Sequence, residues 1–193
     1  MSRAYLIEVC GPTMSEAPIL KDTERSKGRD ALQKNIQAAL ALAEAIRSTL
    51  GPKGLDKLLI DDDGRTLVTN DGVTVLETAK VEHPVAKMMI NASSAQDRVA
   101  KDGTTSTVIL AGEMLQNAWQ LILQGIHPST IARGFRIAEQ FVLKSLEEIS
   151  LKASNDMKKT VVKTSLAGKG HSSMQETIAD ISLRAVNMIV EDN

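Results

Sequence analysis

Residues 99–110 read VAKDGTTSTVIL, a turn of small residues that opens directly into a long apolar run. A helix that begins at this turn presents unpaired backbone N–H groups and the positive end of its dipole, which suit a phosphate. The same turn carries the carboxylate of Asp102, which repels a phosphate unless a cation lies between them. Because Mg²⁺ prefers carboxylate and phosphate oxygens and keeps several of its waters, one aspartate and a nucleotide are enough to hold it. The stretch therefore predicts a magnesium–nucleotide site at the start of a helix.

The residues around this turn suggest separate roles in such a site. Asp102 is the expected magnesium ligand. The residues that follow are expected to take phosphate oxygens through N–H groups and hydroxyls: Gly103, Thr104, Thr105 and Ser106. A second acid, Asp71 in the turn Asn70-Asp71-Gly72, is expected to orient or deprotonate an attacking water. Taken alone, each loop is more often a plain turn or helix cap, but together they indicate nucleotide hydrolysis.

Composition excludes several other functions. The 23 Lys and Arg residues balance 24 Asp and Glu residues, so no global charge favours nucleic acid or an anionic membrane as a partner. One Trp, one Tyr and two Phe leave no platform on which bases could stack. No run approaches the roughly 18 apolar residues of a membrane span. The single cysteine, Cys10, excludes an internal disulfide and fits a reducing compartment, so we expect a cytoplasmic chain.

Apolar residues recur at spacings of three and four along most of the chain, which predicts a mainly helical fold. A β-hairpin is expected where two short apolar runs, 57–60 and 66–69, flank an Asp-Gly turn. Residues 1–28 lack a helical period and are expected to form a flexible arm whose only strand-like piece is 17–20. The expected helices cover about 30–50 (ended by Gly51-Pro52), 73–79, a segment from Pro84, a segment from the 102–106 turn to about 124, 128–149, 156–165 and a last pattern to about 189.

The three histidines do not indicate a metal site. His83 and His127 each precede a proline, and proline is favoured at the first position of a helix. His171 has no ligand-like spacing to either of them. We therefore interpret the two His-Pro pairs as helix starts.

Two further loops resemble known ion or phosphate motifs but lack essential residues. The acidic run 61–64 could suggest a calcium loop, but Arg65 and the absence of the later glutamate favour a hairpin turn. Lys169 lies between two glycines, yet Lys163 occupies the position where a P-loop needs its first glycine.

Several stretches, in this order, resemble the N-terminal part of a group II chaperonin subunit, the family of the archaeal thermosome and the eukaryotic cytosolic chaperonin. They are PILKDTERSKGRDAL from Pro18, TLGPKGLDKLL from Thr49, LVTNDGVTVL from Leu67, VEHPVAKMM from Val81, DGTTSTVILAGEML from Asp102, IHPSTIARGFRIA from Ile126 and TSLAGKG from Thr164. The order of TLGPKG, NDG and DGTT makes the resemblance specific, and it covers nearly everything after the first 17 residues.

The resemblance implies an ATP-driven folding chamber of two stacked rings. Residues 29–150 would be the first part of a helical equatorial domain with its small β-hairpin, and 151–193 the start of the intermediate domain. The hairpin resembles a stem-loop that extends a neighbouring subunit's sheet. Expected partners are other chaperonin subunits in a homo- or hetero-oligomeric ring, and unfolded client proteins bound through an apical domain absent from this sequence. Neither nucleic acid nor membrane is an expected partner.

The resemblance also implies site residues, with ATP and Mg²⁺ as cofactors. Asp102 matches the magnesium ligand, and Asp71 matches an acid near the γ-phosphate and its attacking water. Lys169 matches a lysine that senses the γ-phosphate and couples ATP state to lid movement. The remaining matches to nucleotide-binding positions are Leu50, Gly51, Pro52, Gly72 and the cradle Gly103, Thr104, Thr105 and Ser106.

One position departs from the family pattern inside the site. The family usually has glycine immediately before DGTT, where this chain has Lys101, and acids just upstream, where it has Arg98 and Val99. If the backbone there needs a positive φ, a residue other than glycine costs about 1–2 kcal/mol. Lys101 then either adds a phosphate contact or distorts the cradle, and the sequence leaves both open.

Two functions from different classes follow. The first is an ATP-hydrolysing chaperone subunit, of which this sequence is an N-terminal fragment or a truncated form. Alone it would be incomplete for catalysis, because the resemblance places another acid and further nucleotide contacts in a returning half that is absent here. The alternative is a non-enzymatic module that binds nucleotide or joins a ring.

Overall fold

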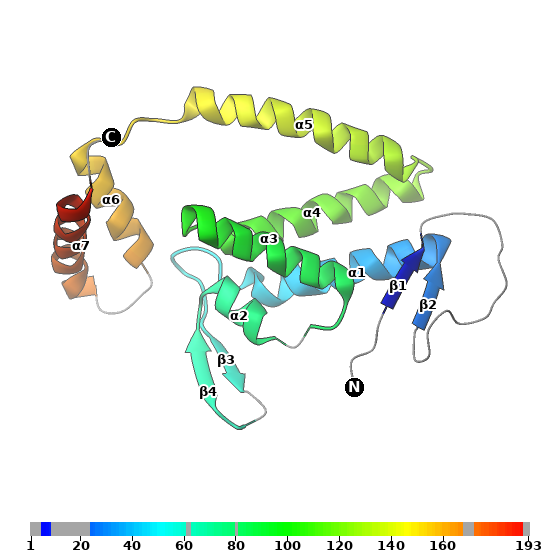
Figure 1. Cartoon of the computed structure of the whole chain (residues 1–193), viewed down its shortest axis with the longest axis horizontal. Helices are drawn as coiled ribbons and strands as arrows, with labels where there is room; N and C mark the ends of the chain where they lie inside the picture. Colours follow the sequence, from blue (N-terminus) through cyan, green and yellow to red (C-terminus); the bar gives the residue numbers. More distant parts are fainter. Residues whose placement is uncertain (1–4, 9–23, 61–62, 80, 168–171, 191–193) are drawn as a thin grey trace. The chain divides into compact units, whose positions relative to one another are not determined.

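The computed structural model describes residues 5–8, 24–60, 63–79, 81–167 and 172–190, and these are mainly helical (Figure 1). The predicted fold class, helices with a small β-hairpin, is confirmed. The elements are β1 Tyr5–Glu8, β2 Glu24–Lys27, α1 Gly28–Arg47, β3 Lys57–Ile60, β4 Thr66–Thr69, α2 Gly72–Thr78, α3 Pro84–Ala100, α4 Thr104–Leu123, α5 Pro128–Ile149, α6 Asn155–Leu166, the 3₁₀ turn η1 Ser172–Met174 and α7 Gln175–Ile189.

The chain divides into two compact units. The first comprises Met1–Leu50 and Gly54–Ala132, and the second comprises Gly51–Lys53 and Arg133–Asn193. The division falls inside α5, whose only buried residue is Ile131 near its start. The functional domain boundary expected near Ser150 stays a prediction.

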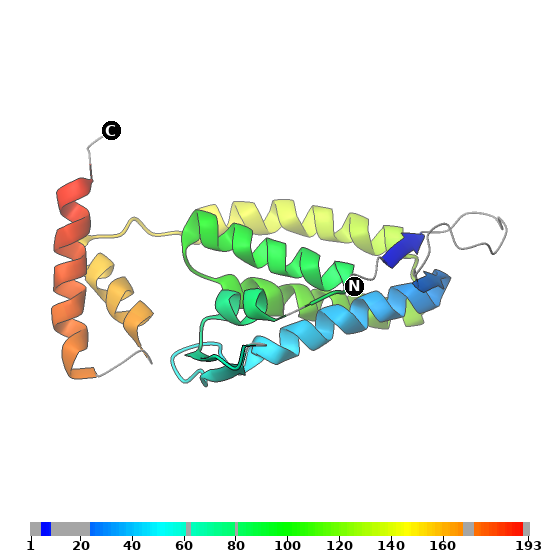
Figure 2. The same ribbon diagram turned by 60° about the horizontal axis from the view of Figure 1, so that its bottom comes forward.

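The core of the first unit lies between α1, α2, α3 and α4, which pack against one another in both views (Figures 1 and 2). α1 contributes one apolar stripe at helical spacing, in which Ala39, Ala43 and Ile46 are almost completely buried. The backbones of α1 and α4 approach closely, since a Cβ at Gly112 of α4 would lie 2.6 Å from the Ala43 Cβ. Ala43 and Gly112 are small because the two helices leave no room between them.

α1 ends earlier than its sequence pattern predicts. We expected Gly51-Pro52 to stop it, but the helix ends at Arg47 with Ser48 as its C-cap. The Thr49 N–H and hydroxyl both donate to the Ile46 carbonyl, at 2.9 and 2.8 Å. These bonds close a tight last turn, so the chain leaves the helix before proline is reached.

The N-terminal arm contains two strands that the sequence pattern missed. β1 and β2 pair in parallel, with Tyr5 opposite Glu24 and Glu8 opposite Lys27. β2 reads ERSK and has no apolar alternation that would predict a strand. Its pairing with β1 uses backbone N–H and C=O groups, which every residue except proline offers in full. The strand-like piece at 17–20 lies outside the described residues, and the flexibility of the arm stays a prediction.

The predicted hairpin is confirmed. β3 and β4 are antiparallel, with Lys57 opposite Thr69 and Ile60 opposite Thr66. Gly64 in the turn has φ +77°, which glycine adopts at little cost. Apolar side chains on both strands are exposed, and Leu58, Ile60 and Val68 are each more than half accessible. The addition of this hairpin to a neighbouring sheet stays a prediction.

Ion pairs join α6 to α7 in the second unit. Lys159 of α6 contacts Glu176 at 2.6 Å and Asp180 at 2.7 Å, and Lys163 also pairs with Glu176. Hydrogen bonds from Lys159 and then Lys163 lower the pKa of Glu176 to about 2. The same contacts raise the pKa of Lys159, with Asp180 the larger cause. Charge pairing therefore links two helices that bury little apolar surface.

Candidate functional site

The start of α4 has the geometry that the DGTTS turn predicts. Gly103 is the N-cap residue with φ +78°, and no side chain in the described part of the chain caps this helix. Thr104 is buried, Thr105 is half-buried and Ser106 is exposed. The first-turn N–H groups of α4 are therefore left for an acceptor that approaches along the helix axis, such as a phosphate oxygen.

Asp102 lies exposed at the mouth of this helix. Its Oδ1 accepts a 2.7 Å hydrogen bond from the Gly103 N–H, and its own carbonyl accepts one of 3.0 Å from the Gln96 side-chain amide. A carboxylate offers about four acceptor positions, so these bonds leave capacity for a cation. The orientation of Asp102 is thus held by its neighbours while the group stays open to solvent.

The structure brings the Asn70-Asp71-Gly72 turn against the cradle. A Cβ on Gly72 would lie 2.2 Å from the Thr105 Oγ1, so the first turns of α2 and α4 touch at this glycine. Asp71 is the N-cap of α2, and its Oδ2 accepts from the Thr74 N–H at 3.0 Å and the Thr74 hydroxyl at 2.6 Å. Asp71 is exposed beside the cradle, with its carboxylate fixed by Thr74.

Magnesium fits this donor set better than a metal that needs many protein ligands. Among the described residues, no three His, Cys, Asp or Glu side chains gather into a group that could hold a metal ion. Mg²⁺ does not need such a group, because one or two carboxylates, phosphate oxygens and water complete its shell. Asp102 beside the uncapped start of α4 satisfies that requirement.

Comparison with known proteins identifies the family. The model of the TCP-1/cpn60 chaperonin family matches residues 42–193. The chain belongs to this family. Thermosome subunit beta of Archaeoglobus fulgidus is 46% identical over 187 residues, which cover 94% of this chain and 34% of the relative. Thermosome subunit beta of Thermoplasma acidophilum is 45% identical over 177 residues, covering 90% and 33%.

A third relative is also a thermosome subunit of similar identity. The thermosome subunit of Methanopyrus kandleri is 44% identical over 172 residues, covering 88% of this chain and 32% of the relative. The resemblance to group II chaperonins is therefore confirmed. The chain spans about a third of the length of the curated relatives it matches.

The TLGPKG loop of this chaperonin chain leaves α1 through a buried turn. Thr49 is buried and anchored to the carbonyl of Ile46, whereas Leu50 is 47% exposed. Gly51 has φ +82°, and Gly51 and Pro52 are both exposed. These two residues belong to the second compact unit, so their place beside the cradle stays a prediction. Lys169 lies outside the described residues, and its role also stays a prediction.

Lys101 occupies the position where the chaperonin pattern usually has glycine, and whether it contacts a phosphate stays a prediction. Lys101 is the C-cap of α3 and adopts φ +56°, ψ +16°, the left-handed conformation that the usual glycine would favour. Its N–H donates to the Asp97 carbonyl at 3.1 Å, and its ammonium lies 2.9 Å from the Asp97 Oδ2. The side chain thus folds back along α3. The turn retains the shape expected for glycine, and in this structure the lysine charge is paired with Asp97.

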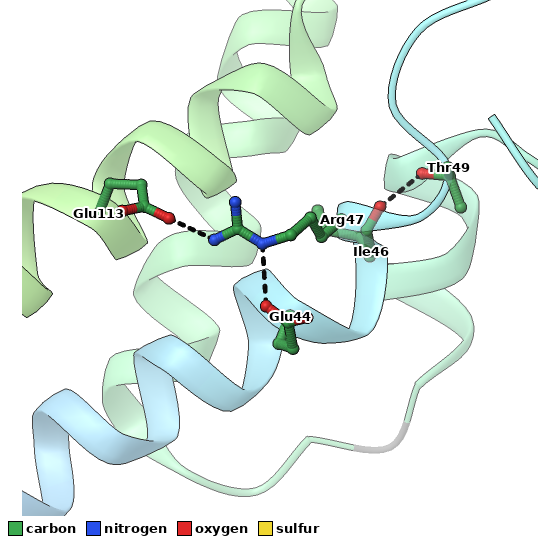
Figure 3. Close-up of polar contacts among 5 residues, drawn as sticks. All are labelled: Glu44, Ile46, Arg47, Thr49 and Glu113. Atoms are coloured by element: carbon green, nitrogen blue, oxygen red, sulfur yellow. Dashed lines mark hydrogen bonds and ion pairs between the residues drawn. The ribbon is translucent and has the colours of Figure 1, made fainter. Parts of the chain in front are cut away.

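Arg47 ties the end of α1 to α4, a contact that sequence reasoning missed. Figure 3 shows its guanidinium between two carboxylates, with Nε 2.8 Å from the Glu44 Oε2 and Nη2 paired with the Glu113 Oε1. Glu113, and then Glu44, raise the pKa of Arg47 above its ordinary value. Arg47 and Glu113 lie 66 residues apart, so no spacing rule connects them. The ion pair of Arg47 with Glu113 holds α1, which leads into the TLGPKG loop, against α4, which begins at the cradle.

The two His-Pro pairs are helix starts, as predicted, because α3 begins at Pro84 and α5 at Pro128. The His83 ring Nδ1 accepts from the Val85 N–H at 3.3 Å, and the His127 Nδ1 accepts from the Ser129 N–H at 3.3 Å. None of the described helices is both long and apolar enough to cross a membrane.

Proposed function

We propose that this chain is the nucleotide-binding part of an ATP-driven chaperonin subunit. The observation that supports it most is the meeting of two helix starts at Gly72 and Thr105, with one exposed carboxylate beside each. One helix start with its aspartate suits a metal-bound phosphate, and the second aspartate is placed to act on water beside it.

Each residue of the site then has a distinct role. Asp102 holds Mg²⁺, while Gly103, Thr104, Thr105 and Ser106 bind phosphate oxygens of ATP. Bound Mg²⁺ supplies charge neutralisation of the phosphates. Asp71 orients or deprotonates the attacking water, and Thr74 keeps its carboxylate in one direction. Leu50, Gly51, Pro52 and Gly72 line the nucleotide, and Lys169 senses its γ-phosphate.

The proposed function also involves other chaperonin subunits and client proteins. The relatives are named thermosome subunits, and we propose that this chain likewise assembles with other chaperonin subunits in a ring in the cytoplasm. ATP hydrolysis would drive the folding of client proteins held by an apical domain. Completion of the catalytic site requires the returning part of the equatorial domain.

A hybrid subunit tests this proposal. The chain would replace the matching third of the Archaeoglobus fulgidus thermosome subunit beta, and Mg·ATP binding and turnover would be measured. Asp102→Ala should weaken Mg·ATP binding and abolish turnover. Asp71→Ala should leave binding nearly intact and lower kcat by about 10²-fold or more, the scale of lost general-base help. Asp63→Ala, an exposed acid of the hairpin turn, is the matched control.

The outcomes separate the competing functions. Equal loss of nucleotide affinity in the Asp71 and Asp102 variants would show that the two roles are wrongly assigned. Binding without turnover in an assembled hybrid would contradict the ATPase proposal and favour a non-enzymatic nucleotide-binding module. Failure of the unsubstituted hybrid to bind Mg·ATP would overturn the proposed site altogether.

A further inference from the structure

Two polar side chains of α3 reach the cradle from one side. Ser93, which is almost completely buried, donates its hydroxyl to the Thr104 carbonyl at 3.2 Å. Gln96 donates its side-chain amide to the Asp102 carbonyl at 3.0 Å. The two donors are three residues apart and therefore lie on the same face of α3. This face contacts the backbone of the cradle through both hydrogen bonds.

The Gln96 bond controls the direction of the peptide that follows Asp102. A peptide unit is planar and trans, so its carbonyl and its N–H point to opposite sides. Because the Asp102 carbonyl points to Gln96, the Gly103 N–H of the same peptide points away from α3. That N–H donates to the Asp102 Oδ1 at 2.7 Å. Gln96 therefore fixes the orientation of the 102–103 peptide, and the N–H of that peptide holds the carboxylate of Asp102, the expected magnesium ligand.

The turn has little regular structure of its own to hold it. Lys101 and Gly103 both have positive φ, at +56° and +78°, so Asp102 lies between two left-handed residues outside either helix. Gln96 is the side chain packed closest to Gly103, since a Cβ added there would lie 3.4 Å from the Gln96 Nε2. A half-buried amide at this distance restrains both the peptide and the space beside it.

We propose that Gln96 is a positioning residue for magnesium at Asp102, an inference that rests on the proposed function. It does not touch the metal or the nucleotide. Its hydrogen bond holds the 102–103 peptide in the orientation that presents the Asp102 carboxylate, while Ser93 and the helix itself hold Thr104 to Ser106. Loss of the Gln96 donor should therefore weaken the part of ATP binding that depends on Mg²⁺, and leave metal-free ATP binding nearly unchanged.

The test compares two identical chemical changes in the hybrid subunit, which supplies the remaining nucleotide contacts of the proposed site. Gln96→Met keeps the length of the side chain and its helix propensity but removes the donor. Gln116→Met makes the same change at an exposed position of α4, well along the helix from the cradle. Calorimetric titration would measure the Kd of ATP with excess Mg²⁺ and again in EDTA. Gln96→Leu removes the same donor but has a branched side chain. It replaces Gln96→Met in the test if the Met variant unfolds.

We expect Gln96→Met to raise the Kd of Mg·ATP about fivefold, the scale of one lost hydrogen bond, and the Kd in EDTA less than about twofold. Gln116→Met should change neither value. If Gln96→Met weakens ATP binding equally with Mg²⁺ and in EDTA, Gln96 only joins α3 to the turn and does not position the magnesium ligand. If Gln96→Met binds ATP like Gln116→Met under both conditions, Gln96 has no role in the site. A parent hybrid that does not bind Mg·ATP would instead overturn the proposed function itself.

Discussion

Lys101→Gly should stabilise the chain, although it removes an ion pair. Lys101 adopts φ +56°, where a residue with a Cβ carries about 1–2 kcal/mol of strain. Glycine relieves that strain but adds about 0.4–1 kcal/mol of entropy to the unfolded chain. The Lys101–Asp97 pair is largely exposed, and its loss costs about 0.3–0.5 kcal/mol. The net gain is about 0.5 kcal/mol.

Lys101→Ala separates these contributions. It removes the ion pair yet keeps the Cβ in the left-handed conformation, so Lys101→Gly should exceed it in stability by about 1 kcal/mol. For a chain of this size that difference corresponds to about 2–4 °C in Tm. Circular dichroism during thermal and urea unfolding would measure it, with all variants at one protein concentration.

Arg98 supplies the matched control, because it lies in the last helical turn of α3. There Arg98→Gly should be less stable than Arg98→Ala by about 1 kcal/mol, since glycine is a poor residue for a helix interior. The order of glycine and alanine thus reverses between two positions three residues apart. If Lys101→Gly is also less stable than Lys101→Ala, the left-handed conformation is wrong.

Three further predictions concern the cradle and the second unit. Gly72→Ala should lower stability by about 1–3 kcal/mol and weaken Mg·ATP binding, because its Cβ would overlap the Thr105 hydroxyl. Thr105→Ala in the same chain should partly restore stability, as thermal unfolding would show, and no restoration would argue against the contact. Glu176 should titrate near pH 2 by carboxyl NMR. Since its folded pKa lies below the ordinary 4.5, its stabilisation of α6–α7 is present above pH 4.5 and is lost as the pH falls toward 2, whereas titration near 4.5 would refute the ion-pair network. Lys169→Ala in the hybrid subunit should leave ADP affinity unchanged but alter the ATP-dependent closing step, as protease protection would show; closure and turnover like the parent would make it a surface residue.

The helices and the hairpin were predictable because their signals are local. The apolar spacing of α1 depends only on residues within a few positions, as does the Asp-Gly turn between β3 and β4. The end of α1 was predicted too late, since Gly51-Pro52 is a strong stop but the Thr49 hydroxyl closes the helix first. β2 was missed for a related reason, because parallel pairing to β1 uses backbone groups that every sequence possesses.

The sequence by itself predicted which residues could hold magnesium and phosphate, because carboxylate, glycine and hydroxyl groups gather in short loops whose chemistry does not depend on the fold. Only the tertiary structure decided which loops meet. The contact of Gly72 with Thr105, the clamp of Arg47 on Glu113 and the bond from Gln96 to the Asp102 carbonyl join side chains through space. The backbone conformation of Lys101 came from the structure too, in which Lys101 is the left-handed C-cap of α3 and its ammonium pairs with Asp97. Such contacts follow from helix packing, which places residues together without regard to their separation along the chain.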